Sequence, residues 1–208
     1  MVGDPLNFGP YESFIVGLTS NAGELTPYPT TKTIQRTQLT DISTLESIEI
    51  RPWQLEIHKR EVDGNTTLIQ RTLEVLEDWR GDDVLKECSG PATYSTTFTL
   101  PGDFDPKICH LYLHFERVCD IVTVTINGET KEPLLLPPWS LDVSNEVKIG
   151  ENILSIKLET TLRNLIVGYG NTKDKRYKKQ YKEYLEQTLM PTGLIGRVSL
   201  IKVNRKTK

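Results

Sequence analysis

The feature that most constrains this chain is a strict alternation of apolar and polar residues in short stretches that end in turn signals. The first clear stretch has Trp53, Leu55 and Ile57 at every second position, and Asp63-Gly64 follows it. A period of two places every second side chain on one buried face of a sheet. Asp-Gly accepts the positive φ angles of a tight hairpin turn. This stretch therefore predicts a half-buried β-strand that leads into a hairpin.

The same alternation recurs along most of the chain. The other inward rows are Tyr94, Thr96, Phe98 and Leu100; Cys109, Leu111, Leu113 and Phe115; Val122, Val124 and Ile126; Leu154, Ile156 and Leu158; and Val198 with Leu200. Pro101-Gly102 and Asn127-Gly128 supply turn signals between them. Six or more strands at this spacing predict an all-β fold, an antiparallel β-sandwich or barrel, and argue against a parallel α/β arrangement.

Five sequence phrases link these strands. They are LEDWRGDDVLKECSGPATYSTTFTLP at 76–101, INGE at 126–129, LPPWSLDVS at 136–144, IGENILSI at 149–156 and PTGLIGRVSLI at 191–201. Their order resembles the galactose-binding-like jelly roll that forms the sugar-binding domain of glycoside hydrolase family 2. The same domain occurs as an accessory module in large α-L-rhamnosidase-type hydrolases. The resemblance covers roughly residues 53–203 and implies an antiparallel β-sandwich that binds sugar or braces another domain and cleaves nothing by itself.

The chain has 208 residues, which fits one sizeable domain with an extension. Residues 45–208 hold the strand pattern and are expected to form the galactose-binding-like β-sandwich. Residues 1–44 match that pattern poorly. We interpret them as an N-terminal extension or the remnant of a preceding domain.

One segment, residues 173–189, departs from the strand pattern. Tyr177, Tyr181, Leu185 and Leu189 recur there at four-residue spacing among many lysines, which predicts a short helical insertion. The plain interpretation is a solvated amphipathic helix, and the alternative is a lid over a ligand or a docking face for a partner. Lysines with interleaved tyrosines also suit a polyanion. Because the chain carries a net charge of −3, we nevertheless expect no nucleic-acid partner.

The residues that could support catalysis or metal binding are not arranged for it. His110 and His114 fall on a strand, where four residues at ~3.3 Å each place the imidazoles roughly 13 Å apart, too far to share one ion. Ser89-Gly90 lacks the flanking glycine pattern of a nucleophile elbow. In the resembled hydrolases the two catalytic carboxylates lie on a separate β/α barrel, which needs about 200 residues or more by itself. We therefore expect no enzyme activity from the isolated chain, no metal and no cofactor, and the sequence gives no sign of a structural calcium ion.

What remains is binding. A sugar presents apolar C–H faces and many hydroxyls, so its site combines an aromatic side chain with fixed polar groups. The residues of this kind near predicted loop ends are Trp79, Arg80, Trp139, Asp142, Arg163, Asn164 and Tyr169. Each residue also has a structural alternative to carbohydrate binding. Trp79 could stabilise its loop by packing, and Asp142 could cap a turn. The Arg163-Asn164 pair could hold its loop through backbone hydrogen bonds.

The leading hypothesis is a non-catalytic carbohydrate-binding or accessory module related to glycoside hydrolases, with a carbohydrate ligand and a hydrolase catalytic domain as partners. The alternative is the structural C-terminal part of a longer or split α-L-rhamnosidase-like glycoside hydrolase, which braces a catalytic domain. Three cysteines in no metal-ligand spacing favour a reducing compartment, and residues 1–10 lack the pattern of a signal peptide. We therefore expect a cytoplasmic protein, and we expect no membrane partner because no apolar run approaches the ~20 residues of a span.

Overall fold

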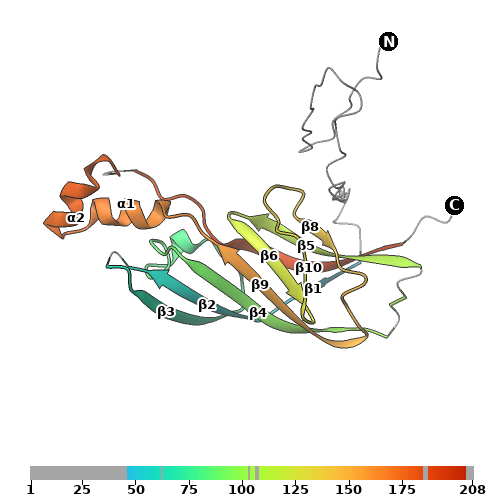
Figure 1. Cartoon of the computed structure of the whole chain (residues 1–208). Helices are drawn as coiled ribbons and strands as arrows, with labels where there is room; N and C mark the ends of the chain where they lie inside the picture. The colour runs from blue at the N-terminus through green and yellow to red at the C-terminus, as the bar shows by residue number, and fades with distance from the viewer. Residues whose placement is uncertain (1–45, 62, 103, 106–107, 185–186, 205–208) are drawn as a thin grey trace, which may run out of the picture.

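The structure is a computed structural model of the whole chain, and it describes residues 46–204 apart from 62, 103, 106–107 and 185–186. The extension or domain remnant expected at 1–44 lies outside the described residues. The described residues form two antiparallel sheets packed face to face around one core (Figure 1). The all-β sandwich expected from the alternation is therefore confirmed.

The larger sheet has six strands in the order β3-β2-β4-β9-β6-β7. Their bounds are β2 (Trp53–Arg60), β3 (Thr66–Leu73), β4 (Pro91–Leu100), β6 (Ile121–Ile126), β7 (Glu129–Thr130) and β9 (Gly150–Glu159). The smaller sheet has the order β1-β10-β5-β8. Its bounds are β1 (Ser47–Glu49), β5 (Cys109–Val118), β8 (Ser140–Asp142) and β10 (Leu194–Asn204). The β2–β3 and β6–β7 hairpins close at the predicted turns, where Gly64, Asn127 and Gly128 have positive φ.

The two sheets share a hydrophobic core built from the predicted inward rows. Thr96 is the exception, because it is half-exposed and its Oγ1 donates to the Pro52 carbonyl oxygen at 2.6 Å. Trp53, Tyr94 and Phe115 head the fully buried side chains by volume. Trp53 meets Tyr94 edge to face, with ring centroids 6.4 Å apart and planes at 87°, the geometry that the ring quadrupoles favour.

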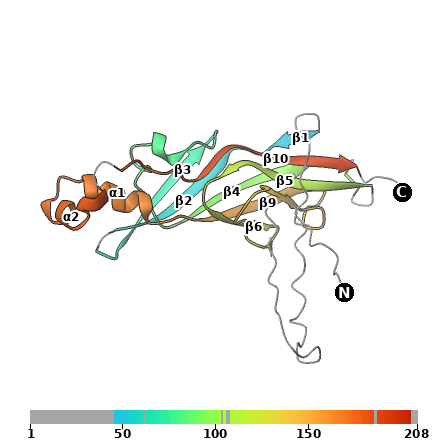
Figure 2. The ribbon, with the colours of Figure 1, turned by 90° about the horizontal axis from the view of Figure 1, so that it is seen from above.

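The helical insertion begins earlier than expected and is not one continuous helix. It consists of α1 (Arg163–Asn171), α2 (Lys175–Gln180) and the 3-10 turn η3 (Lys182–Tyr184). The extended backbone of Thr172 ends α1, and Asp174 caps α2 by accepting a hydrogen bond from Arg176 N at 2.9 Å. Leu185, part of the predicted stripe, lies outside the described residues. Figures 1 and 2 show α1 and α2 projecting beyond one end of the sandwich.

The start of α1 was missed because Gly168 and Gly170 lower the helix propensity of that segment. Packing explains both glycines. A Cβ at Gly168 would lie 2.6 Å from the Glu87 carboxyl carbon, and a Cβ at Gly170 would lie 2.9 Å from the Tyr181 carbonyl oxygen. The same residues that weaken the helical pattern in the sequence therefore let α1 approach its neighbours closely.

Candidate functional site

The seven residues predicted to bind carbohydrate fall into two separate groups. Five lie at the end of the sandwich that carries the helices: Trp79, Arg80, Arg163, Asn164 and Tyr169. Thr192 joins this group together, because it accepts hydrogen bonds from the Trp79 backbone N–H at 3.2 Å and from Asn164 Nδ2 at 3.0 Å. Trp139 and Asp142 lie at β8, on the edge of the smaller sheet. Figure 1 shows α1 and β8 well apart, so the seven residues do not form one site.

Trp79, in the 3-10 helix η2 (Trp79–Gly81), is a core residue, the packing role named as its alternative. Its side chain is 3% exposed, and Nε1 donates to the Tyr94 hydroxyl at 2.8 Å. Arg80 donates to Asp78 through Nε and Nη2 at 2.8 and 2.6 Å. Partial burial opposes ionisation of Asp78, but these hydrogen bonds outweigh it and lower the pKa of the carboxyl. In this structure Trp79 offers no face to a sugar, and the charge of Arg80 is already paired.

Asn164 ties α1 to the segment that leads into β10. The side chain is 3% exposed; its Nδ2 donates to the Met190 carbonyl oxygen and its Oδ1 accepts from the Met190 N–H, both at 2.8 Å. This is the backbone-holding role named as the alternative for the Arg163-Asn164 pair. The pair occupies the first turn of α1, however, and not a loop. Arg163 is exposed and donates to the Gln187 side chain at 3.0 Å.

Tyr169 belongs to a stack of three tyrosine rings. Its ring centroid lies 5.5 Å from that of Tyr177 and 5.9 Å from that of Tyr181, with interplanar angles of 32° and 30°. The stack joins α1 to α2 and to the residue that follows α2. All three rings are partly exposed. The ring faces that neighbouring tyrosines cover are not open to a sugar.

Trp139 faces the core more than the solvent. The register pairs Ser140 with His114, and both lie on the outer face of the smaller sheet because Leu113 and Phe115 point inward. Successive residues of an extended strand point to opposite sides. Trp139 therefore points inward, where it packs against the core and remains partly exposed.

Asp142 lies in a polar cluster on the outer face of β5 and β8. Its Oδ1 accepts from Ser144 N at 3.0 Å and from Ser144 Oγ at 2.5 Å, which is the turn-capping role expected as its alternative. Its Oδ2 lies 2.9 Å from His110 Nδ1. Partial burial opposes ionisation of Asp142, yet these contacts outweigh it and lower the pKa of the carboxyl. Nearby, His114 Nδ1 lies 2.8 Å from Ser140 Oγ, and burial lowers the pKa of His114.

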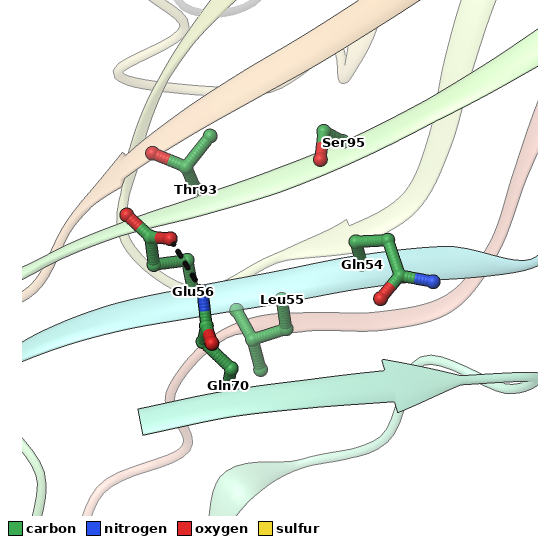
Figure 3. A pocket seen from close by; sticks show the side chains of 6 residues that line it. All are labelled: Gln54, Leu55, Glu56, Gln70, Thr93 and Ser95. Atoms are coloured by element: carbon green, nitrogen blue, oxygen red, sulfur yellow. Dashed lines mark hydrogen bonds between the residues drawn. The ribbon is translucent and has the colours of Figure 1, made fainter. Parts of the chain in front are cut away.

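A shallow depression of about 320 Å³ on the outer face of the larger sheet was missed by the sequence analysis. Its lining comes from β2, β3 and β4: Gln54, Leu55, Glu56, Gln70, Thr93 and Ser95 (Figure 3). Gln70 Nε2 donates to Glu56 Oε2 at 3.0 Å, and the hydrogen bonds from Gln70 and His58 lower the pKa of Glu56. The polar positions of the alternating rows were the available signal. Their convergence depends on strand neighbours and register, which the sequence does not state.

Two general properties limit the chemistry of the described surface. Every described tryptophan, tyrosine and phenylalanine is buried or only partly exposed. No group of three or more histidine, cysteine, aspartate or glutamate side chains that could hold a metal ion occurs among the described residues. Separately, no helix in the described part of the chain is long and apolar enough to cross a membrane.

Comparison with known proteins relates the chain to glycoside hydrolases. No protein-family model matches it. A protein of Formosa agariphila described as "Putative beta-glucuronidase" is 28% identical over 159 residues, which are 71% of this chain and 13% of that protein. A solved rhamnosidase from Novosphingobium sp. PP1Y is 25% identical and has a TM-score of 0.57, with 80% of this chain and 16% of the rhamnosidase covered.

A third comparison bears on the fold alone. The FMN-binding beta-glucuronidase from Facaelibacterium prausnitzii L2-6 has a TM-score of 0.51 at 19% identity, covering 76% of this chain and 22% of that enzyme. The chain thus spans 13% of the curated relative and 16% of the rhamnosidase. It corresponds to a domain that makes up a small part of longer glycoside hydrolases.

Proposed function

We propose that the chain is a non-catalytic accessory domain of a glycoside hydrolase, of the galactose-binding-like kind found in family 2 enzymes, and that it braces a catalytic domain by packing against it. The observation that carries this proposal is the size of the matched segment. Two related hydrolases contain the segment as only 13% and 16% of their length. Most of each enzyme therefore lies outside the part that resembles this chain, including room for a catalytic barrel of about 200 residues or more.

The arrangement of the predicted site residues supports bracing over sugar stacking. The three tryptophans are buried or point toward the core, so none presents an open face on which a sugar ring could lie. The surface does expose apolar side chains: Ile121, Leu135 and Leu136 are 45%, 57% and 55% exposed. The bridge between Val122 and Leu134 places Leu135 beside Ile121. Contiguous exposed apolar groups are characteristic of surfaces that pack against another protein.

The test combines this chain with a glycoside hydrolase catalytic domain, either the adjoining part of one polypeptide or the product of a neighbouring gene. We expect the two to co-purify and the catalytic domain to unfold at a higher temperature in the complex. The Leu135→Asp/Leu136→Asp variant should weaken that association, because it places charges in an apolar contact. Thr97→Asp, an exposed change on the larger sheet, is the matched control. Hydrolysis of aryl glycosides by this chain alone, or no effect on its partner, would contradict the proposal.

A second candidate function is weak binding of a neutral oligosaccharide in the depression on β2, β3 and β4. The amide, carboxylate and hydroxyl groups lining it supply donors and acceptors for sugar hydroxyls (Figure 3), and the Glu56 carboxylate disfavours an acidic sugar. Without an aromatic platform, we expect a Kd of roughly millimolar. Calorimetric titration should show binding that Glu56→Ala and Gln70→Ala abolish and Thr97→Ala preserves. Equal binding by all variants would exclude this site.

A further inference from the structure

The helices form a fixed projection with its own packing. We define the helical projection as residues 163–184, which span α1, α2 and η3. The Tyr169–Tyr177–Tyr181 stack joins its parts, and Asn164 anchors it, through Met190, to the segment that enters β10. The projection therefore holds its surface side chains on a defined frame.

That frame displays an unusual concentration of positive charge. Residues 173–184 contain five lysines, one arginine and two acids, a net charge of +4, whereas the rest of the chain carries −7. Arg176 is paired with Asp174 at 3.2 Å. The lysines make no ion pair with any described residue, and all are exposed: Lys173, Lys175, Lys178, Lys179 and Lys182. Unpaired, exposed charges of one sign on a rigid element form an attractive surface for a polyanion.

We propose that the helical projection binds an anionic polysaccharide through the acidic groups spaced along it. The lysine ammonium groups would pair with carboxylate or sulfate groups. The partly exposed side chains of Tyr177 and Tyr181 alternate with these lysines in the sequence and can contact the apolar C–H groups of the sugar rings. The choice of a polysaccharide rests on the proposed role beside a glycoside hydrolase, whereas the choice of an anion rests on the charge distribution alone.

The charge on the rest of the chain favours a polysaccharide over a nucleic acid. Duplex DNA carries one charge per about 1.7 Å, and the −7 on the remainder of this chain would repel so dense a polyanion. A polysaccharide with one acidic group on each sugar, or on every second sugar, is less densely charged. Such a polysaccharide can therefore bind the helical projection, because the negatively charged remainder of the chain repels it less than it repels DNA. Base stacking also needs open ring faces, and the Tyr177 ring already contacts both the Tyr169 ring and the Arg176 guanidinium.

The experiment is affinity electrophoresis of the full chain in gels that contain polygalacturonate, dextran sulfate or neutral dextran. We expect one or both anionic gels to retard the protein and neutral dextran to have no effect. Retardation by polygalacturonate indicates recognition of carboxylate groups, and retardation by dextran sulfate indicates recognition of sulfate groups. Lys175→Gln/Lys179→Gln should lower the affinity measured from the retardation about tenfold at low salt, because it removes two of the five exposed lysine charges. Lys148→Gln/Lys157→Gln, two exposed lysines outside the projection, is the matched control and should bind like the unchanged chain.

Three results would overturn the proposal. One is equal retardation of the unchanged chain and the Lys175→Gln/Lys179→Gln variant, with circular dichroism showing both folded. Another is oligo(dT) binding at least as tightly as either polysaccharide at 150 mM salt. At that salt concentration the Debye length is about 8 Å, so interactions between exposed charges farther apart are largely screened. The third is no retardation by any anionic gel. Failure here would leave the bracing role intact, because that role is tested at Leu135 and Leu136 and not at the lysines.

Discussion

Trp79 and Tyr94 are joined by a buried hydrogen bond of 2.8 Å between the indole Nε1 and the phenol oxygen. Tyr94→Phe leaves the indole N–H without its acceptor, and Trp79→Phe removes the donor and part of the packed ring. We expect each single change to lower the free energy of unfolding by about 1–3 kcal/mol. The double variant should lose less than the sum, because both changes break the same bond. Urea denaturation of the four proteins measures this, and strict additivity would contradict the coupling.

Gly90 is fixed by the backbone of a neighbouring strand. It has φ +132°, and a Cβ there would lie 2.2 Å from the His58 carbonyl oxygen. Gly64 also has positive φ, +86°, but a Cβ there meets nothing within 4 Å. Gly64→Ala should cost about 1–2 kcal/mol from the left-handed conformation alone. We expect Gly90→Ala to cost at least about 2 kcal/mol more, as measured by thermal unfolding; equal costs would show that the strand moves aside freely.

Asp142 should make stability depend on pH in the acid range. Its pKa is lowered in the fold from the ordinary 3.8, so the ionised carboxylate stabilises the folded state above that value, and this contribution disappears as the pH falls through the folded-state pKa. Asp142→Asn keeps an acceptor for Ser144 and removes the charge. Because the side chain is 42% exposed, we expect a deficit below about 1 kcal/mol at pH 7. In denaturation experiments the deficit should shrink as the pH falls below 3.8 and through the folded-state pKa, and a constant gap would exclude the electrostatic cause.

Strands and helices differ in how far the sequence determines them. The strand rows at 53–57, 122–126 and 154–158 were predictable because a period of two and a turn signal are local properties. The helix α1 was missed because Gly168 and Gly170 satisfy contacts with Glu87 and Tyr181 that are distant in sequence. The placement of the candidate site residues could not be predicted for the same reason. Whether Trp79 and Asn164 bind a ligand or pack depends on Tyr94, Met190 and Thr192, and only the tertiary structure brings these together.

Helix α1 depends on the side chain of Asn164 for its anchor. Asn164 makes three hydrogen bonds, at 2.8, 2.8 and 3.0 Å, to the segment that enters β10. Asn164→Ala removes both bonds to the Met190 backbone and the bond to the Thr192 hydroxyl, and it should free the helical projection locally. Hydrogen exchange should rise in α1 and at 190–192 by at least about tenfold while β4 and β9 stay protected. Arg163→Ala, which removes one exposed contact to Gln187, is the control and should leave exchange nearly unchanged.

At the scale of the whole molecule, the helical projection depends on the sandwich for its stability, but the sandwich does not depend on the projection. The core cluster includes residues of both sheets, whereas Leu165 and Val167 of α1 are buried outside that cluster. The projection is anchored to the sandwich by the hydrogen bonds from Asn164 to Met190 and Thr192, in the segment that enters β10, so it cannot keep this anchor when the sandwich unfolds. The reverse does not hold, because the sheets retain their own core when α1 opens.

This asymmetry predicts a one-way effect of mutations. Ile156 is fully buried in β9 between β4 and β6, and Ile156→Ala should lower the global free energy of unfolding by about 2–5 kcal/mol through the lost contacts and the cavity. Exchange should then accelerate in the strongly protected amides of both sheets. Asn164→Ala should accelerate only the projection. Measured side by side by hydrogen exchange, equal effects of Asn164→Ala on β5 and on α1 would mean that the chain unfolds as one indivisible unit, and would refute the separation argued from the core.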